Sequence, residues 1–231
     1  MWGKGFALKT HFNTSPGEYD ALREGYLGKR RLDVVRGELA GIEQRVRAVV
    51  ELGSGPGRLA AQLARCFPSI QFKGVDIDAR MVAYATQHHR LDNLEFSLAD
   101  ASGDDSLPEC DFMYSVDTLH HIHDLHGCLR SAAQALGPNG TWLLMEPNIF
   151  NAFVFASQER MRRAGFDEDH LRPWQIEQLM RQEGFRIQAR RYAFMFPGKI
   201  ARLPPLLARL ERLCERHRLT GCYVIYTLVR G

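Results

Sequence analysis

The stretch Arg47-Ala-Val-Val-Glu-Leu-Gly-Ser-Gly-Pro-Gly57 decides the fold of this chain. A short run of β-branched and apolar residues ends at Leu52, and glycines occupy positions 53, 55 and 57 directly after it. Apolar residues then recur at helical spacing from Leu59 to Ala64, so the segment predicts a strand, a tight turn and a helix. Because glycine adopts positive φ and has no Cβ, the backbone of this turn can approach a ligand closely at the carboxyl end of the strand.

The spacing of these glycines narrows the kind of ligand. They form a G-x-G-x-G pattern, and Arg58 stands where the dinucleotide fingerprint G-x-G-x-x-G has its third glycine. The chain also lacks the Gly-Lys-Ser/Thr sequence of a nucleoside triphosphate loop. A second apolar strand over 72–75 ends at Asp76, at the separation at which an acidic side chain meets ribose hydroxyls. The pattern therefore argues against a nicotinamide dinucleotide or a nucleoside triphosphate and favours a ligand that carries a ribose.

Five segments follow one another along the chain in an order that is more specific than any one of them. They are Glu51–Gly57, Gly74–Asp78, Leu98–Ala101, Asp111–Asp117 and Leu136–Gly140. In this order they resemble the motifs of the class I S-adenosylmethionine-dependent methyltransferases, and the resemblance covers roughly residues 45 to 231.

The alternation of strands and helices predicts an α/β fold, and the resemblance makes the expectation more definite. It implies a Rossmann-like, doubly wound sheet of seven strands whose last strand is antiparallel. We expect an N-terminal arm and helical cap over 1–44 and a methyltransferase domain over 45–231. Within this domain, an insertion after the fifth strand, 148–172, is expected to act as a lid over the substrate, and a second, helical insertion spans 198–217.

The resemblance implies S-adenosylmethionine as the cofactor and assigns residues to each part of it. Gly53 and Gly55 would lie against the methionine part, with Glu51 near its ammonium group. The remaining assignments are Asp76 for the ribose hydroxyls, Ile77 for the adenine face, Asp100 and Ala101 for the exocyclic amine, the Ser115 carbonyl at the end of the fourth strand, and Tyr19 as the aromatic of the closing cap. Taken singly, each acid has the alternative of a solvated turn residue or helix cap, and Tyr19 that of a half-buried packing residue.

Histidines follow the fourth predicted strand, where the transferable methyl group should lie. A histidine pKa suits general-base chemistry near neutral pH, and His120 and His121 are the candidates. With Glu146 at the end of the fifth strand, the pair resembles the two histidines and acid of sugar O-methyltransferases, except that the acid here is Glu rather than Asp. The alternative is that one histidine is a core residue and the other is solvated.

The same histidines raise the question of a metal. His120, His123 and His126 could share one helix face with Cys128 close by, but no carboxylate is placed to complete such a site. We therefore expect no metal.

The methyl acceptor is expected under the cap and the insertion 148–172, whose phenylalanines favour an apolar or aromatic small molecule. By their order along the chain, His170, Arg172 and Trp174 flank the same pocket, or else they mark a helix start. A leucine stripe over 203–213, accompanied by arginines, predicts an amphipathic helix. Packing on the sheet is its default role, a homodimer contact the second and a membrane-surface contact the third.

Composition limits the partners and the location. A formal net charge of +3 on 231 residues, without a concentrated basic face, argues against nucleic acid. Five cysteines without a C-x-x-C pair indicate neither disulfides nor a zinc ribbon. The sequence has neither a leader-like apolar segment nor a run of roughly 20 apolar residues, so we expect a cytoplasmic protein without a membrane span.

These patterns predict an enzyme that methylates a small molecule in a biosynthetic reaction. Oxygen is the expected acceptor atom, and nitrogen or carbon is the alternative. Methylation of RNA or protein is an alternative, but Ser115-Val-Asp-Thr118 stands where an Asn-Pro-Pro-Tyr-like motif for planar nitrogens would lie. A non-catalytic cofactor-binding subunit and a nicotinamide-dependent oxidoreductase are more distant readings, disfavoured by the histidine pair and by Arg58 respectively.

Overall fold

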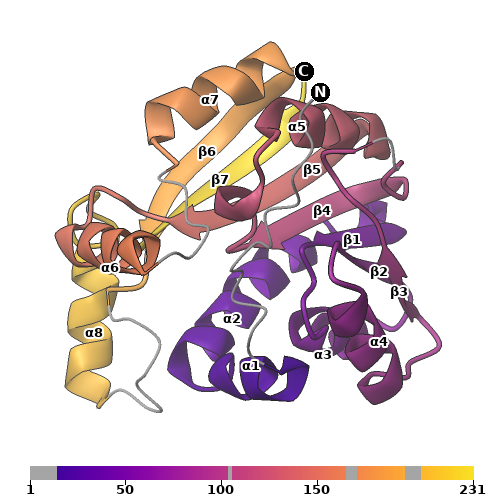
Figure 1. The fold of residues 1–231 in the computed structure, drawn as a ribbon, viewed down its shortest axis with the longest axis horizontal. Coiled ribbons are helices and arrows are strands. Elements are labelled where there is room, and N and C mark those ends of the chain that lie inside the picture. The colour runs from indigo at the N-terminus through magenta and orange to yellow at the C-terminus, as the bar shows by residue number, and fades with distance from the viewer. Residues whose placement is uncertain (1–14, 104–105, 165–170, 196–203) are drawn as a thin grey trace.

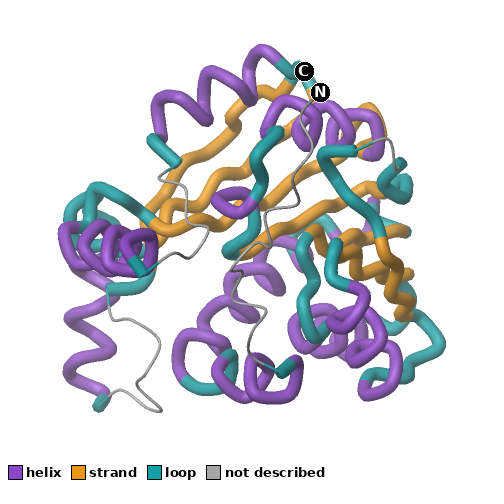
Figure 2. The backbone as a smooth tube through the Cα atoms, in the orientation of Figure 1, coloured by secondary structure: helices purple, strands orange, loops and turns teal. Residues whose placement is uncertain are grey.

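The protein, a computed structural model, is described over residues 15–103, 106–164, 171–195 and 204–231. Its centre is a seven-stranded sheet in the order β3-β2-β1-β4-β5-β7-β6, with helices on both faces (Figures 1 and 2). The strands are β1 Ala48–Leu52, β2 Gln71–Asp76, β3 Leu94–Leu98, β4 Cys110–Val116, β5 Leu136–Pro147, β6 Phe185–Ala193 and β7 Tyr223–Arg230. The helices are α1 Pro16–Leu22, α2 Tyr26–Ala40, α3 Arg58–Cys66, α4 Ala79–His88, α5 Leu125–Ala135, α6 Ala152–Arg163, α7 Pro173–Gln182 and α8 Pro205–Cys214.

The pairing of the strands confirms the predicted Rossmann-like fold. β1 pairs in parallel with β2 and β4, and the parallel ladder continues outward to β3 and β5. β7 runs antiparallel to both of its neighbours, β5 and β6. Parallel pairing places the carboxyl ends of β1 to β5 at one edge, where ligands bind in sheets of this kind.

Each central strand sends alternate side chains to two separate apolar cores. Val49 and Phe112 belong to the core that packs against α2 and α3, whereas Val50 and Met113 belong to the core that packs against α5 and α7. This division follows from the period of two in a strand. A sheet covered on both faces explains why its central strands are almost continuously apolar.

The last motif, Leu136–Gly140, lies inside β5, which begins at Leu136. Leu136 already pairs with Cys110, and regular pairing resumes at Thr141 with Phe112, so the residues between them form an irregularity in the ladder. Gly137, Pro138 and Gly140 therefore lie in a bulge near the start of β5.

The cap consists of α1 and α2. Ser15 begins α1 with a capping box, in which its Oγ accepts the Glu18 N–H at 3.3 Å and the Glu18 carboxylate accepts the Ser15 N–H at 3.1 Å. Arg58, the first residue of α3, donates two bonds of 2.7 Å each to the carboxylate of Asp20. This bidentate pair fixes α1 against the end of the glycine turn.

The default prediction for the leucine stripe is wrong. The stripe does form a helix, α8, but its leucines at 206, 207, 210 and 213 are exposed, and the helix turns Glu211 and Glu215 inward instead. The helix faces polar groups, and Arg30 and the Met195 N–H donate hydrogen bonds to these two carboxylates. These bonds hold the helix in place. Leu203 lies outside the described residues, as do parts of both expected insertions.

In the described parts of the chain, every helix is too short or too polar to cross a lipid bilayer.

Two glycines, one in a tightly packed place and one with open space beside it, provide a matched pair of substitutions. Gly57 has a φ of 81°, and a Cβ there would lie 2.5 Å from Phe96, so Gly57→Ala should lower the free energy of unfolding by about 2–4 kcal/mol. Gly37 lies in α2 with nothing within 4 Å of its added Cβ, so Gly37→Ala should raise that free energy by about 0.5–1 kcal/mol. Urea unfolding of both variants measures the two changes in the free energy of unfolding. Equal changes would contradict the close contact at Gly57 and the open space at Gly37.

Candidate active site

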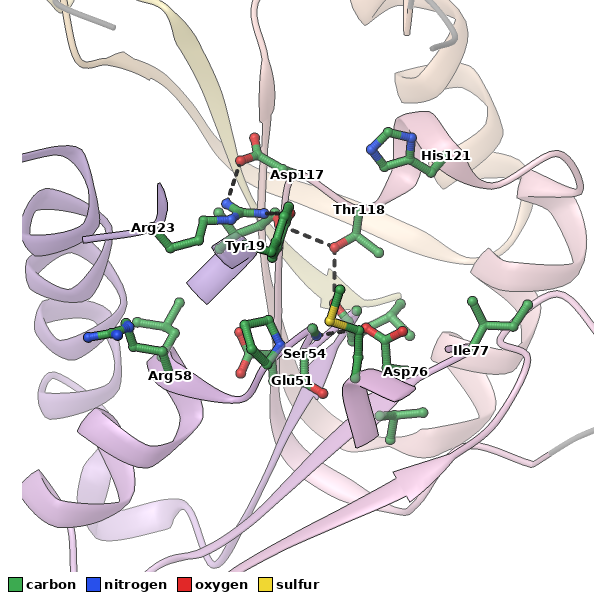
Figure 3. A pocket seen from close by; sticks show the side chains of 18 of the residues that line it. Tyr19, Arg23, Glu51, Ser54, Arg58, Asp76, Ile77, Asp117, Thr118 and His121 are labelled. Atoms are coloured by element: carbon green, nitrogen blue, oxygen red, sulfur yellow. Dashed lines mark hydrogen bonds and ion pairs between the residues drawn. The ribbon is translucent and has the colours of Figure 1, made fainter. Parts of the chain in front are cut away.

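A cavity of about 710 Å³ opens at the carboxyl edge of the sheet. Its wall comes from the glycine turn after β1, the ends of β2 and β4, the segment after β3, and the cap helices (Figure 3). Elements far apart in the chain therefore meet around one space, which matches the expected place of a ligand.

The glycine turn forms the floor of this cavity. Gly53 and Gly55 have φ values of 73° and 52°, a conformation that other residues rarely adopt. A Cβ on Gly53 would lie 2.4 Å from the side chain of Thr118, so the turn also depends on glycine for space. The Gly53 and Ser54 N–H groups donate to the Val75 carbonyl at 2.8 and 3.0 Å, which ties the turn to β2.

Asp76 closes the turn from the end of β2. Its Oδ2 accepts the Gly55 N–H at 2.7 Å, and its Oδ1 accepts the Asp78 N–H at 2.9 Å. Burial raises the pKa of this carboxyl, and the backbone N–H groups act in the opposite direction. A carboxylate has about four acceptor positions, so Asp76 keeps the capacity to accept from a ligand hydroxyl, such as one of a ribose.

Glu51 lies deeper, at the end of β1. Its side chain is buried, and its Oε2 accepts the Ala60 N–H in the first turn of α3 at 3.1 Å. Burial raises the pKa of Glu51 to about 8. A cationic group in the cavity would favour the ionised form, so the site is suited to an ammonium or sulfonium ion.

Ile77, Asp100 and Ala101 lie along the part of the cavity beyond Asp76. Ile77 is 60% exposed although it lines the cavity, so its side chain offers an apolar surface to a ring. Asp100 Oδ1 accepts from the backbone N–H and the Oγ of Ser102 at 2.9 and 2.7 Å, which orients the carboxylate. Ala101 follows in the same wall. The structure brings these predicted adenine contacts together.

Ser115 is not brought to the cavity. Its side chain is fully buried and accepts a hydrogen bond from Trp142 Nε1 at 3.0 Å, and Val116 occupies the lining at this point. In the parallel ladder Ser115 pairs with Leu52 and Leu144, one residue before β4 ends at Val116.

Tyr19 enters the cavity from the cap, as Figure 3 shows. Its ring lies 3.7 Å from the place of a Cβ on Gly55, and its hydroxyl accepts a hydrogen bond from Arg23. The guanidinium of Arg23 also lies 5.0 Å from the centre of this ring. The tyrosine therefore covers the glycine turn and is held by a residue of its own cap.

The two candidate histidines have different positions. His121 lines the cavity. His120 is buried behind it, with Nδ1 2.7 Å from Glu146 Oε2 and its ring centre 4.0 Å from that of His121. Glu146 Oε1 accepts the N–H groups of Thr118 and Leu119 at 3.0 and 2.8 Å. The predicted trio is thus contiguous, with one member at the cavity and two supporting it.

Sequence reasoning missed a cluster around Asp117. This residue has a φ of 55°, which is uncommon for a residue other than glycine, and its carboxylate binds Arg23 at 2.8 Å and also Arg31. Arg31 donates in turn to the hydroxyl of Tyr223. Burial by itself would raise the pKa of Asp117, but Arg31 and Arg23 outweigh it and hold the pKa well below its usual value. No sequence signal marked this cluster, since Asp117 lies 94 and 86 residues from its two arginines.

Of the other candidates, His123 also lines the cavity, and the rest lie elsewhere. His126 Nδ1 lies 2.9 Å from Glu183 on the surface, Cys128 is buried in the core, and across the four described ranges no three His, Cys, Asp or Glu residues are grouped to hold a metal ion. Arg172 lies over the ring of Trp174 at 5.9 Å, and neither residue lines the cavity. His170 is outside the described residues.

Comparison with known proteins gives this geometry its context. Residues 24–190 match a family described as a methyltransferase domain. The chain is 28% identical over 146 residues to the trans-aconitate 2-methyltransferase of Mycobacterium tuberculosis, covering 63% of this chain and 51% of that protein. It is 22% identical over 165 residues to the malonyl-[acyl-carrier protein] O-methyltransferase of Acetivibrio thermocellus, covering 70% and 57%. The chain thus spans little more than half the length of these curated relatives.

Among solved structures, a possible histamine N-methyltransferase of Thermotoga maritima has the same fold, with a TM-score of 0.69 at 20% identity over 93% of this chain and 96% of that one. The chain belongs to the class I S-adenosylmethionine-dependent methyltransferases. The residues present fit this cofactor, because the glycine turn leaves room that a Cβ would fill and Asp76 retains free acceptor positions.

The raised pKa of Glu51 generates a prediction for cofactor binding. Because a bound cation favours the ionised carboxylate, binding of S-adenosylmethionine at neutral pH should release a proton from Glu51, and affinity should rise with pH up to about 8. Calorimetry at pH 7 in buffers of different ionisation enthalpy measures the protons released. Glu51→Gln should bind about tenfold or more weakly and release none from this group. Equal proton release by the variant and the original chain would contradict this assignment.

Proposed function

We propose that this chain transfers a methyl group from S-adenosylmethionine to a hydroxyl oxygen of a small molecule. The observation that carries the proposal is the position of His121, which lines the same cavity as the cofactor residues and stands in front of the buried pair of His120 and Glu146. The cofactor supplies an electrophilic methyl group when it is bound. The acceptor must then lose a proton, and we assign His121 as the base that takes it.

The chain's own residues divide the remaining work. Asp76 and the glycine turn hold the cofactor end of the cavity, and the cap closes the other side through Tyr19. Glu146 acts as a positioning residue, because its two oxygens bind the Thr118 and Leu119 N–H groups and His120. His120 in turn packs against the ring of His121. This chain of contacts fixes the direction of the proton acceptor toward the cavity.

A carboxylate acceptor is the second candidate, favoured by the basic residues of the cap. Lys29 and Arg31 of α2 line the cavity together with Arg23, and on the cap side they face the acids Glu24 and Asp117, of which Asp117 binds the two arginines. The two curated relatives carry the names of a malonyl-[acyl-carrier protein] and a trans-aconitate methyltransferase, which supports an acidic acceptor. A carboxylate attacks without losing a proton, so this reaction would not need His121.

His121→Ala separates the two candidates. If the acceptor is a hydroxyl, removal of the base should lower kcat by about 10²–10⁴-fold while cofactor affinity stays unchanged. The measurement is transfer of labelled methyl groups to a panel of phenols, hydroxy acids and carboxylic acids. Treatment with mild base distinguishes the products, because it cleaves methyl esters and leaves methyl ethers intact.

Glu146→Gln provides the matched control. Glutamine keeps the shape of the side chain, but its amide carries no charge to hold a protonated histidine. The variant should therefore lower kcat less than His121→Ala does and leave the cofactor affinity unchanged. Full activity of His121→Ala on a hydroxyl acceptor, with cofactor binding intact, would exclude the proposed base. Full activity with a methyl ester as the product would favour the carboxylate candidate.

A further inference from the structure

Helix α8 has its apolar and polar faces reversed relative to a helix that packs on a core. Its inward residues include Glu211, which is 0% exposed, and Glu215, which is buried beside it. Glu211 accepts from the Tyr26 hydroxyl and from the Met195 N–H at 3.1 Å, and Glu215 accepts from Arg30 Nη2 at 2.7 Å. These bonds satisfy the buried carboxylates, so the orientation of α8 is specified by polar contacts.

The outward face of the same helix is apolar. Leu206 and Leu213 are 77% and 79% exposed, and Leu210 lies between them with 44% of its surface in solvent. Spacings of four and three residues place these leucines on one side of the helix. Leaving such side chains in water forgoes about 25 cal/mol for each Å² of apolar surface, and a group of them on one ridge marks a contact site.

Within residues 204–231 the exposed charges all have one sign. Arg209, Arg212, Arg216 and Arg218 are exposed, whereas the acids of residues 204–231 are the two buried glutamates. The ridge therefore combines apolar side chains with a positive border, which is the composition of helices that lie at the surface of an anionic bilayer. The long arginine side chains can reach lipid headgroups while the leucines enter the acyl region.

We propose that α8 docks this protein on a membrane surface that carries anionic lipids. A second copy of the chain is disfavoured as the occupant, because a symmetric contact through this face would place arginines opposite arginines. A protein partner is disfavoured by the shape of the surface. The ridge belongs to one helix of 10 residues, about 15 Å long, at the edge of the molecule (Figure 1). One face of so short a helix has a smaller area than the roughly 800 Å² that each side of a stable protein interface buries. A lipid surface requires no matching groove.

The docking face is joined directly to the cap of the cavity. Tyr26 and Arg30, the partners of the buried glutamates, lie on α2, and Gly28, Lys29 and Arg31 of the same helix line the cavity. A membrane bound at α8 would thus be fixed relative to α2. This inference does not depend on which atom is methylated, and its test needs no substrate.

Sedimentation with lipid vesicles tests the proposal. The full chain is mixed with vesicles of phosphatidylcholine containing about 30% phosphatidylglycerol, and in parallel with vesicles of phosphatidylcholine alone. We expect binding to the anionic vesicles that weakens as salt is raised. Replacing both Leu206→Gln and Leu213→Gln should weaken this binding at least tenfold. Leu98→Gln, which changes a leucine 58% exposed on β3, should leave it unchanged.

Circular dichroism and light scattering complete the experiment. The double variant should keep the secondary structure and melting temperature of the original chain, because both leucines are largely exposed, and both proteins should have the same mass in solution. The proposal is overturned if the original chain fails to bind anionic vesicles, as an acidic protein partner would predict, or if the double variant binds them equally well. It is also overturned if the leucine substitutions convert a dimer into a monomer, because the face would then be an interface between copies.

Discussion

The hydrogen bond between the Gly55 N–H and the carboxylate of Asp76 joins the two strands on which the site depends. Through it, the turn after β1 and the end of β2 are held in one arrangement at 2.7 Å, and the positive φ values of the turn are maintained by a partner in the neighbouring strand. The bond uses one acceptor position of the carboxylate and leaves others toward the cavity. A single residue therefore supports the loop and faces the ligand.

The pKa values of the two deep carboxylates of this cavity shift in opposite directions, because their neighbours differ. Glu51 is surrounded by the core and the start of α3, so burial dominates and the pKa rises to about 8. Burial raises the pKa of Asp117 as well, but two guanidiniums bind its carboxylate and lower the pKa by more. The cavity thus has one acid that can respond to a cationic ligand and one that is ionised as part of the framework.

Ion pairs determine how the cap and α8 are attached to the sheet. Asp20 binds Arg58 at the start of α3, Asp117 binds Arg23 and Arg31, and Glu215 binds Arg30. Each pair joins an element outside the central sheet to the cap or to the cavity. Their partly buried geometry makes them directional, so they specify orientation more than they add stability. The outward direction of the α8 leucines follows from the same principle.

Local patterns in the sequence were sufficient for the order of strands and helices and for the edge of the sheet at which the cofactor residues gather. Glycines that need positive φ, acids at strand ends and the periods of apolar residues are properties of short segments, so the positions of Gly53, Asp76 and Asp100 could be predicted. The tertiary structure alone decided which histidine reaches the cavity, that Ser115 stays in the core, and that Asp117 pairs with arginines of the cap. It also turned the leucines of α8 outward. These outcomes depend on contacts between residues 26 to 192 positions apart, and such contacts are set by how whole elements pack.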